Sequence, residues 1–340
     1  MMRLHVFIVF LVLGATAFAW ESKKANLAGL DGFVERMGAG IREQALGNTG
    51  VADREAQPGA FWNPALVASS RQGIVMSVGG EQRSMGRTGT QVGVQSGVGT
   101  RGGVGFALLG RGDTDFEVVN EEDEDLGQAY PYFYMAYIAV GWRLNRYDLL
   151  GVSFSRSGEN LGVAQYYSEL RDDGQSPTSY NLGWHHTWSS RFETGMVVRN
   201  LGFNSDLSAR WTRNPSNGSE SQALRPKTLE MGATYSTKVK GRPFGLRVEV
   251  LDYLLADTLF VFDPDWHYWT ARFGAEWEPI SGGWLRAGFD SKNLTCGLGY
   301  QFNLRWNKKP WPLQLDWVFV YETLAGQWNP VSVGVRTRIP

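Results

Sequence analysis

Residues 130–142 read YPYFYMAYIAVGW, and their side chains fall into two faces at alternate positions. A period of two is typical of a β-strand, because successive side chains point to opposite sides. Residues 244–253 repeat the alternation, with Arg247 and Glu249 on one face and aliphatic residues on the other. A strand with one apolar and one charged face suits a wall between lipid and a lumen. One face of residues 130–142 carries Tyr132, Tyr134, Ala136, Ile138, Val140 and Trp142, and the mixed face carries Phe133, Met135, Tyr137, Ala139 and Gly141.

Similar segments of about ten residues, separated by turn residues, fill the chain from residue 71 onward. This pattern predicts an all-β fold, a transmembrane antiparallel barrel of about fourteen strands over residues 71–340. A short ambiguous segment at 161–167 leaves the count open by two. The expected strands are 71–82, 87–98, 101–111, 130–143, 149–157, 177–188, 191–201, 226–237, 243–254, 266–277, 282–290, 294–303, 311–321 and 327–339.

The lengths of the connections fit such a barrel. The four longest, 112–129, 158–176, 202–225 and 255–265, all follow odd-numbered strands and therefore lie on one side. The connections after strands two, four, six, eight and ten are short. Outer-membrane barrels have long outer loops and short periplasmic turns, so this sorting predicts an outer-membrane location.

Aromatic residues gather at the ends of the segments. Rings at the level of the lipid headgroups form girdles in such barrels. Ordinary β-propensity also favours aromatic residues, but the girdle is the preferred interpretation. The residues are Tyr130, Trp142, Trp188, Trp266, Trp269, Trp311 and Trp328.

The first nineteen residues have the order of a secretory signal peptide. A basic start is followed by an apolar run over 6–13 and by small residues ending in Ala17-Phe18-Ala19. The run is short for a membrane helix, which needs about 20 residues. The net charge of −1 gives no support to nucleic-acid binding. A mean hydropathy of −0.27 suits a barrel, in which only alternate strand residues face lipid.

Residues 20–70 differ from the rest, because their glycine-punctuated texture predicts two short helices rather than strands. Fourteen strands enclose a lumen too wide for wall side chains alone to fill. We therefore expect residues 20–70 to form a helical plug, or hatch, inside the barrel.

Two parts of this segment, 45–52 (ALGNTGVA) and 60–66 (AFWNPAL), resemble the N-terminus of PorV/PorQ-type outer-membrane proteins, within the broader FadL-like superfamily. Residues 225–235 are similar to a mid-barrel strand of that family. The chain departs from the usual pattern at its end, Pro340, where many barrels finish on an aromatic residue. The plug motif is Phe61, Trp62, Asn63, Pro64 and Ala65.

The resemblance implies a fourteen-stranded barrel with a luminal plug and leaves two functions open. PorV-like members serve type IX protein secretion, receiving cargo or its signal. FadL-like members pass hydrophobic small molecules. We favour the secretion partner, with the transporter as the alternative and an outer-membrane enzyme as a remote third. The motif residues are interpreted as plug structure, and Asn63 as a helix cap or part of a gate. The expected partners are outer-membrane lipid and lipopolysaccharide, secretion proteins or cargo, or a hydrophobic small molecule.

Chemistry of other kinds finds little support in the sequence. No catalytic motif or cofactor site stands out. An acidic run in the first long loop offers Asp123, Glu124 and Asp125 as calcium ligands, but a solvated loop is the favoured interpretation. His185 and His186 are neighbours in a strand and point to opposite faces, which prevents joint metal binding. The single cysteine, Cys296, is expected to be a packed strand residue.

Overall fold

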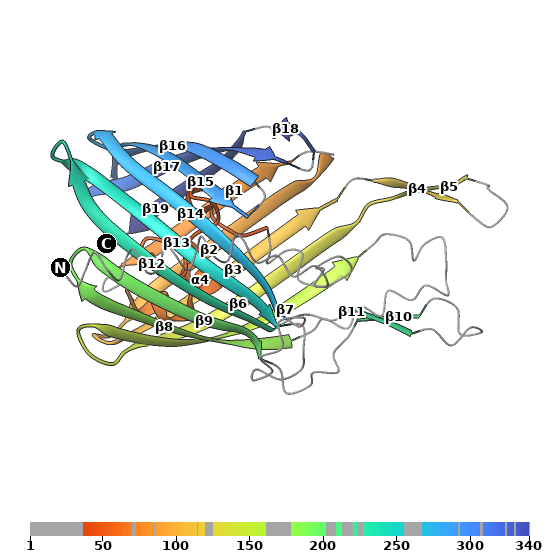
Figure 1. Cartoon of the computed structure of the whole chain (residues 1–340), viewed down its shortest axis with the longest axis horizontal. Coiled ribbons are helices and arrows are strands. Elements are labelled where there is room, and N and C mark those ends of the chain that lie inside the picture. The colour runs from red at the N-terminus through yellow and green to blue at the C-terminus, as the bar shows by residue number, and fades with distance from the viewer. Residues whose placement is uncertain are drawn as a thin grey trace.

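Fourteen strands close into one antiparallel barrel in the computed structural model, within the residues that it describes (Figure 1). These residues are 37–69, 73–83, 86–113, 115–119, 125–160, 178–201, 209–212, 220–223, 227–254, 267–291, 293–306, 309–323, 325–329 and 331–339. The predicted signal peptide, the segment at 161–167, Trp266, Asp123 and Glu124 lie outside them. The predicted fold class and the number of strands are confirmed.

Each barrel strand pairs with its neighbours in chain order, and the barrel closes where the C-terminal strand β19 pairs with both β1 and β17. Closure gives every wall strand two partners, so no unpaired edge meets lipid. The strands are β1 (Ile74–Gln82), β2 (Thr88–Val98), β3 (Gly102–Gly112), β6 (Tyr132–Arg143), β7 (Asp148–Asn160), β8 (Thr178–Ser189), β9 (Phe192–Leu201), β12 (Lys227–Val239), β13 (Arg242–Leu254), β14 (His267–Ile280), β15 (Gly283–Asp290), β16 (Asn293–Trp306), β17 (Lys309–Glu322) and β19 (Ser332–Ile339).

The last predicted strand, 327–339, is longer than the strand in the structure. Gln327–Trp328 forms a separate two-residue strand, β18, which pairs with the end of β17. The turn chemistry between residues 328 and 332 was missed, because the aromatic Trp328 reads as a strand residue. Several other strands extend one to three residues beyond the predicted limits.

The alternation found in residues 130–142 separates the two sides of the wall. In β6, the side chains of Tyr132, Tyr134, Ile138, Val140 and Trp142 are exposed on the outside, whereas those between them are mostly buried inside. The exterior is thus a broad apolar surface, which a closed barrel keeps in contact with lipid. The chain is a transmembrane barrel of the outer-membrane type, as predicted. Of the expected girdle, Tyr130, Trp142, Trp188 and Trp328 are exposed, while Trp269 and Trp311 are half-buried.

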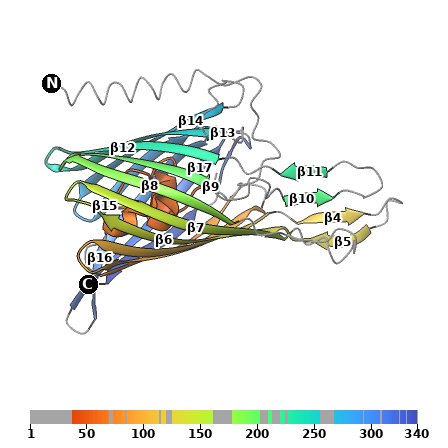
Figure 2. The same ribbon diagram turned by 90° about the horizontal axis from the view of Figure 1, so that it is seen from below.

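Two small hairpins project from the end of the barrel where the long predicted loops lie (Figures 1 and 2). One joins β4 (Phe116–Val119) to β5 (Asp125–Ala129), and the other joins β10 (Ala209–Thr212) to β11 (Glu220–Ala223). The opposite end carries short turns, so by the asymmetry of such barrels it is the periplasmic end.

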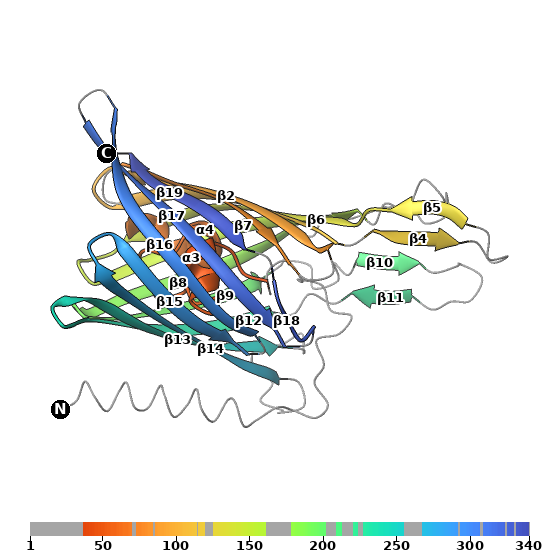
Figure 3. The same cartoon turned by 90° about the horizontal axis from the view of Figure 1, so that it is seen from above.

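Residues 37–69, called here the luminal segment, lie inside the barrel (Figure 3). They contain two short helices, α3 (Ile41–Ala45) and α4 (Gly59–Trp62), and a 3-10 turn, η1 (Pro64–Ser69). Nearly all of their side chains are buried against wall strands. No helix in the described part of the chain is long and apolar enough to span a membrane.

Candidate functional site: the interface between luminal segment and wall

The plug motif lies near the C-terminal end of the luminal segment and is wholly buried. Asn63 ends α4, and its side-chain amide holds three partners at once. Its Nδ2 donates to the carbonyl oxygens of Val51 at 2.9 Å and Trp184 at 3.0 Å, and its Oδ1 accepts from the backbone N–H of Ala65 at 3.0 Å. Asn63 therefore caps η1 and ties the segment to β8. Pro64 opens η1, where its missing N–H is no loss.

The two aromatic residues of the motif face different neighbours. Trp62 donates its indole N–H to the carbonyl oxygen of Ala39 at 3.0 Å, which joins the two ends of the luminal segment. Phe61 packs edge-on against Trp62 and against Tyr137 of β6, with ring centroids 5.0 and 5.5 Å apart. Arg199 of β9 donates to the carbonyl oxygens of both residues and pairs with Glu230 at 2.8 Å.

The segment touches the wall backbone directly at glycines. A Cβ on Gly183 of β8 would lie 2.1 Å from Oδ1 of Asn63, and one on Gly288 of β15 would lie 2.0 Å from the backbone nitrogen of Gly47. Real side chains never approach that closely, so glycine is required at both positions. No layer of wall side chains separates the segment from the barrel there.

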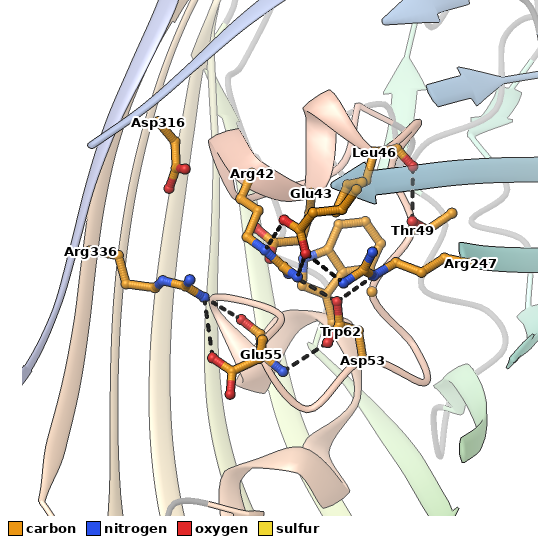
Figure 4. A network of polar contacts seen from close by, with 12 residues as sticks. Arg42, Glu43, Leu46, Thr49, Asp53, Glu55, Trp62, Arg247, Asp316 and Arg336 are labelled. Atoms are coloured by element: carbon orange, nitrogen blue, oxygen red, sulfur yellow. Dashed lines mark hydrogen bonds and ion pairs between the residues drawn. The ribbon is translucent and has the colours of Figure 1, made fainter. Parts of the chain in front are cut away.

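One side of the lumen is charged, and Figure 4 shows its centre. Arg42 of α3 contacts three carboxylates: Glu43 at 3.0 Å, Asp53 at 2.9 Å and Glu276 of β14 at 2.9 Å. Arg247 of β13 contacts two of them, Asp53 at 2.6 Å and Glu276 at 3.0 Å. Buried charges are tolerated only when paired in this way.

The same network continues across the next strands toward the periplasmic end. Arg286 of β15 bridges Glu276 at 2.6 Å and Asp316 of β17 at 2.7 Å. Arg336 of β19 then donates to the carbonyl oxygen of Glu55 at 2.7 Å, back on the luminal segment. The network thus ties the segment to strands that are distant in sequence.

Two carboxylates of the luminal segment, neither in a membrane-spanning strand, differ in their ionisation. Burial alone would raise the pKa of Asp53, but the guanidinium groups of Arg247 and Arg42 hold it well below its usual range. For Glu43, burial outweighs the attraction of Arg42 and raises the pKa to about 7. Asp53 is therefore a fixed anion, whereas Glu43 titrates near neutral pH.

The lumen also contains an apolar cluster. Leu109 of β3, Met135 and Tyr137 of β6 and Val197 of β9 belong to one buried cluster with Phe61, and Phe133 is partly buried at its border. We call these four wall residues, together with Phe133, the apolar wall. Sequence reasoning saw only a mixed face in β6, because nothing in the chain showed that Leu109 and Val197 would join it.

Two cavities of mixed lining lie between the luminal segment and strands β1, β17 and β19. A cavity of about 140 Å³ at the periplasmic end is lined by Glu55, Gln314 and Arg338, among others. A smaller one of about 20 Å³ lies beside Arg42 and Glu43. Gln57 and Arg336 line both cavities, so they stand between the larger space and the charged centre.

The remaining candidates do not join this site. Asp125 begins β5 in a projecting hairpin. His185 is buried in the lumen, whereas His186 faces outward. Cys296 of β16 is exposed on the outer face, so the expectation of a packed residue was wrong; its strand position alone could not show which face it takes. Among the described residues, no group of three or more His, Cys, Asp or Glu side chains could hold a metal ion.

No family model and no curated protein matches the sequence. Solved structures do match the fold over nearly its whole length. The toluene transporter TbuX of Ralstonia pickettii is 12% identical, with a TM-score of 0.54 over 90% of this chain and 99% of that one. The toluene transporter TodX of Pseudomonas putida is 13% identical, with a TM-score of 0.56 over 89% and 97%. The monoaromatic hydrocarbon channel CymD is 12% identical in sequence, with a TM-score of 0.52. These likenesses show that the chain shares the barrel fold of those structures.

Proposed function

We propose that this chain is an outer-membrane channel for hydrophobic small molecules, with the luminal segment as its plug. The observation that carries the proposal is the apolar wall, which lines part of an otherwise largely polar lumen and belongs to one cluster with Phe61 of the luminal segment. An apolar molecule gains free energy when it leaves water for such a surface, whereas charged side chains would have to give up hydration to make contact with it.

The structural likenesses support the same function, because the matched proteins are described as toluene transporters and a monoaromatic hydrocarbon channel. The transporter, which is the alternative in the sequence analysis, is therefore better supported than the favoured role as a secretion partner. The narrower resemblance to PorV-type proteins stays a prediction.

Uptake in whole cells tests the proposal. Cells that depend on this barrel should take up labelled toluene or another apolar probe faster than cells without it, at equal barrel abundance. Replacing Phe133 by Glu should slow this uptake several-fold, because it places a charge at the border of the apolar wall. Equal uptake with and without the barrel would overturn the proposal.

The second candidate function is that of a binding partner in protein secretion. The projecting hairpins β4–β5 and β10–β11 favour it, because they offer a surface beyond the membrane. Pull-down of the detergent-solubilised barrel with and without residues 116–129 tests it. Loss of secretion subunits or cargo on deletion supports this role, and recovery of the barrel with bound lipid alone contradicts it.

A further inference from the structure

A carboxylate lies on the outer face of the barrel at its periplasmic end. Asp148 begins β7 and points outward, in the row that continues with the exposed Leu150. The neighbouring residue Leu149 points the opposite way, into the lumen, where it packs with Ala65 and Ala68. A charged residue among lipid-facing positions is costly, so its presence calls for a partner.

Three side chains hold this carboxylate in place. Oδ1 of Asp148 lies 2.7 Å from Nδ1 of His186 and 3.2 Å from Nε1 of Trp184, both on β8. Oδ2 accepts from Nδ2 of Asn145 at 2.8 Å. These donors fix the position of the carboxylate on the outer face. About a quarter of the Asp148 side chain (23%) remains accessible.

Aromatic rings lie around His186, the closest partner of the carboxylate. The ring of His186 lies 4.4 Å from Trp188, 5.7 Å from Trp184 and 6.1 Å from Tyr147, measured between centroids. Faces of tryptophan and tyrosine attract organic cations. Aromatic residues of this kind also mark the depth of the lipid headgroups.

A cation lies beside the aromatic group. The guanidinium carbon of Arg146 lies 4.4 Å from the centroid of the Tyr147 ring, on the short turn between β6 and β7. Arginine is well suited to phosphate, which it binds through two parallel hydrogen bonds. The outer face thus offers the cation of Arg146 over the Tyr147 ring, and the anion of Asp148 beside His186 and Trp184.

We propose that Arg146, Asp148 and the rings of Tyr147, Trp184 and Trp188 form a binding site for a phospholipid headgroup with both a phosphate and a primary ammonium. Arg146 takes the phosphate. Asp148 and the aromatic rings take the ammonium. The acyl chains lie along the exposed apolar row of Leu150 and Trp142. The occupant is a lipid of the inner leaflet, because the site lies at the periplasmic end.

Native mass spectrometry of the folded barrel tests the site directly. The barrel is equilibrated with equal amounts of phosphatidylethanolamine and phosphatidylglycerol, and the ratio of the two bound lipids is measured. The wild-type chain should retain phosphatidylethanolamine in preference. Asp148→Asn should lower the bound ratio about fivefold, the size expected for one partly exposed ion or cation–π contact. Arg146→Gln should reduce retention of both lipids.

Arg242→Gln is the matched control, because Arg242 is an exposed arginine at the periplasmic end of another strand, β13. It should leave the ratio unchanged. Heat-dependent gel mobility confirms that each variant is folded. An equal ratio in the wild type and in Asp148→Asn would overturn the proposal, as would displacement of the lipid by inorganic phosphate, which would assign the site to the free anion.

Discussion

The guanidinium of Arg42 and the carboxylate of Glu276 form a two-point ion pair, with Nε–Oε2 at 3.1 Å and Nη2–Oε1 at 2.9 Å. The pair joins the luminal segment to β14, and both side chains are more than nine-tenths buried. Such a contact fixes orientation as well as distance, because the planar guanidinium must match the plane of the carboxylate. It is the central tether between the segment and the charged side of the lumen.

Replacing Arg42 by Ala should loosen the luminal segment. Three carboxylates would lose a partner in a buried place, at a cost of about 3–5 kcal/mol. In planar bilayers, the variant should open to ion-conducting states more often, or at lower urea, than the wild-type barrel. Arg242→Ala, which changes an exposed arginine, is the control. Identical conductance in all three proteins would show that the ion pair does not hold the segment.

Replacing Gly183 by Val should displace the luminal segment from β8, since even a Cβ would lie 2.1 Å from Asn63 Oδ1. The matched control is Gly80→Val on β1, where a Cβ would meet nothing within 4 Å. The Gly183 variant should yield less folded, heat-modifiable barrel or a leaky one. If both variants fold and seal equally well, the close contact at Gly183 is of no importance.

The segment should be held more firmly at pH 5.5 than at pH 8, as judged by the urea needed to induce conductance. The pKa of Glu43 is raised by burial to about 7 from 4.5. Its contribution to stability is therefore complete below about pH 4.5 and is lost as the pH rises through about 7. Asp53, whose pKa is lowered, stays ionised throughout this window.

Glu43→Gln should remove most of this pH dependence, because a neutral amide keeps the shape and carries no charge to desolvate. A difference between pH 5.5 and 8 that persists in Glu43→Gln would assign it to another group.

Tyr137→Phe and Phe133→Leu should leave uptake of an apolar probe nearly unchanged, whereas Phe133→Glu should slow it. The first two changes keep the apolar wall apolar and preserve most of its volume. Uptake measured at equal barrel abundance checks the series. An equal loss in all three variants would point to a packing defect rather than to the surface itself.

The strands of the barrel wall could be predicted from the sequence, but the contacts inside the lumen could not. Alternation is a local property, so residues 130–142 and 244–253 could be assigned to faces without any knowledge of their neighbours. The hairpins β4–β5 and β10–β11 were missed, because strands of four or five residues within long loops carry too little pattern.

The contacts of the luminal segment were beyond such reasoning for a different reason. Arg42 and Glu276 lie 234 residues apart, and only the register of the closed barrel brings them together. The motif around Asn63 predicted a buried, structural segment. Its three partners, on Val51, Ala65 and Trp184, could not be read from spacing.

The glycine contacts have a consequence for assembly. The luminal segment rests on the backbone of β8 at Gly183 and of β15 at Gly288, two strands on different sides of the circumference. The luminal segment also precedes every barrel strand in the described chain. If the barrel closed first, the luminal segment would have to enter it past the arginines and carboxylates of the wall. The simpler order is that the strands assemble around the segment, which then acts as a template. It sets the circumference at which the last strand pair, β19 with β1, forms.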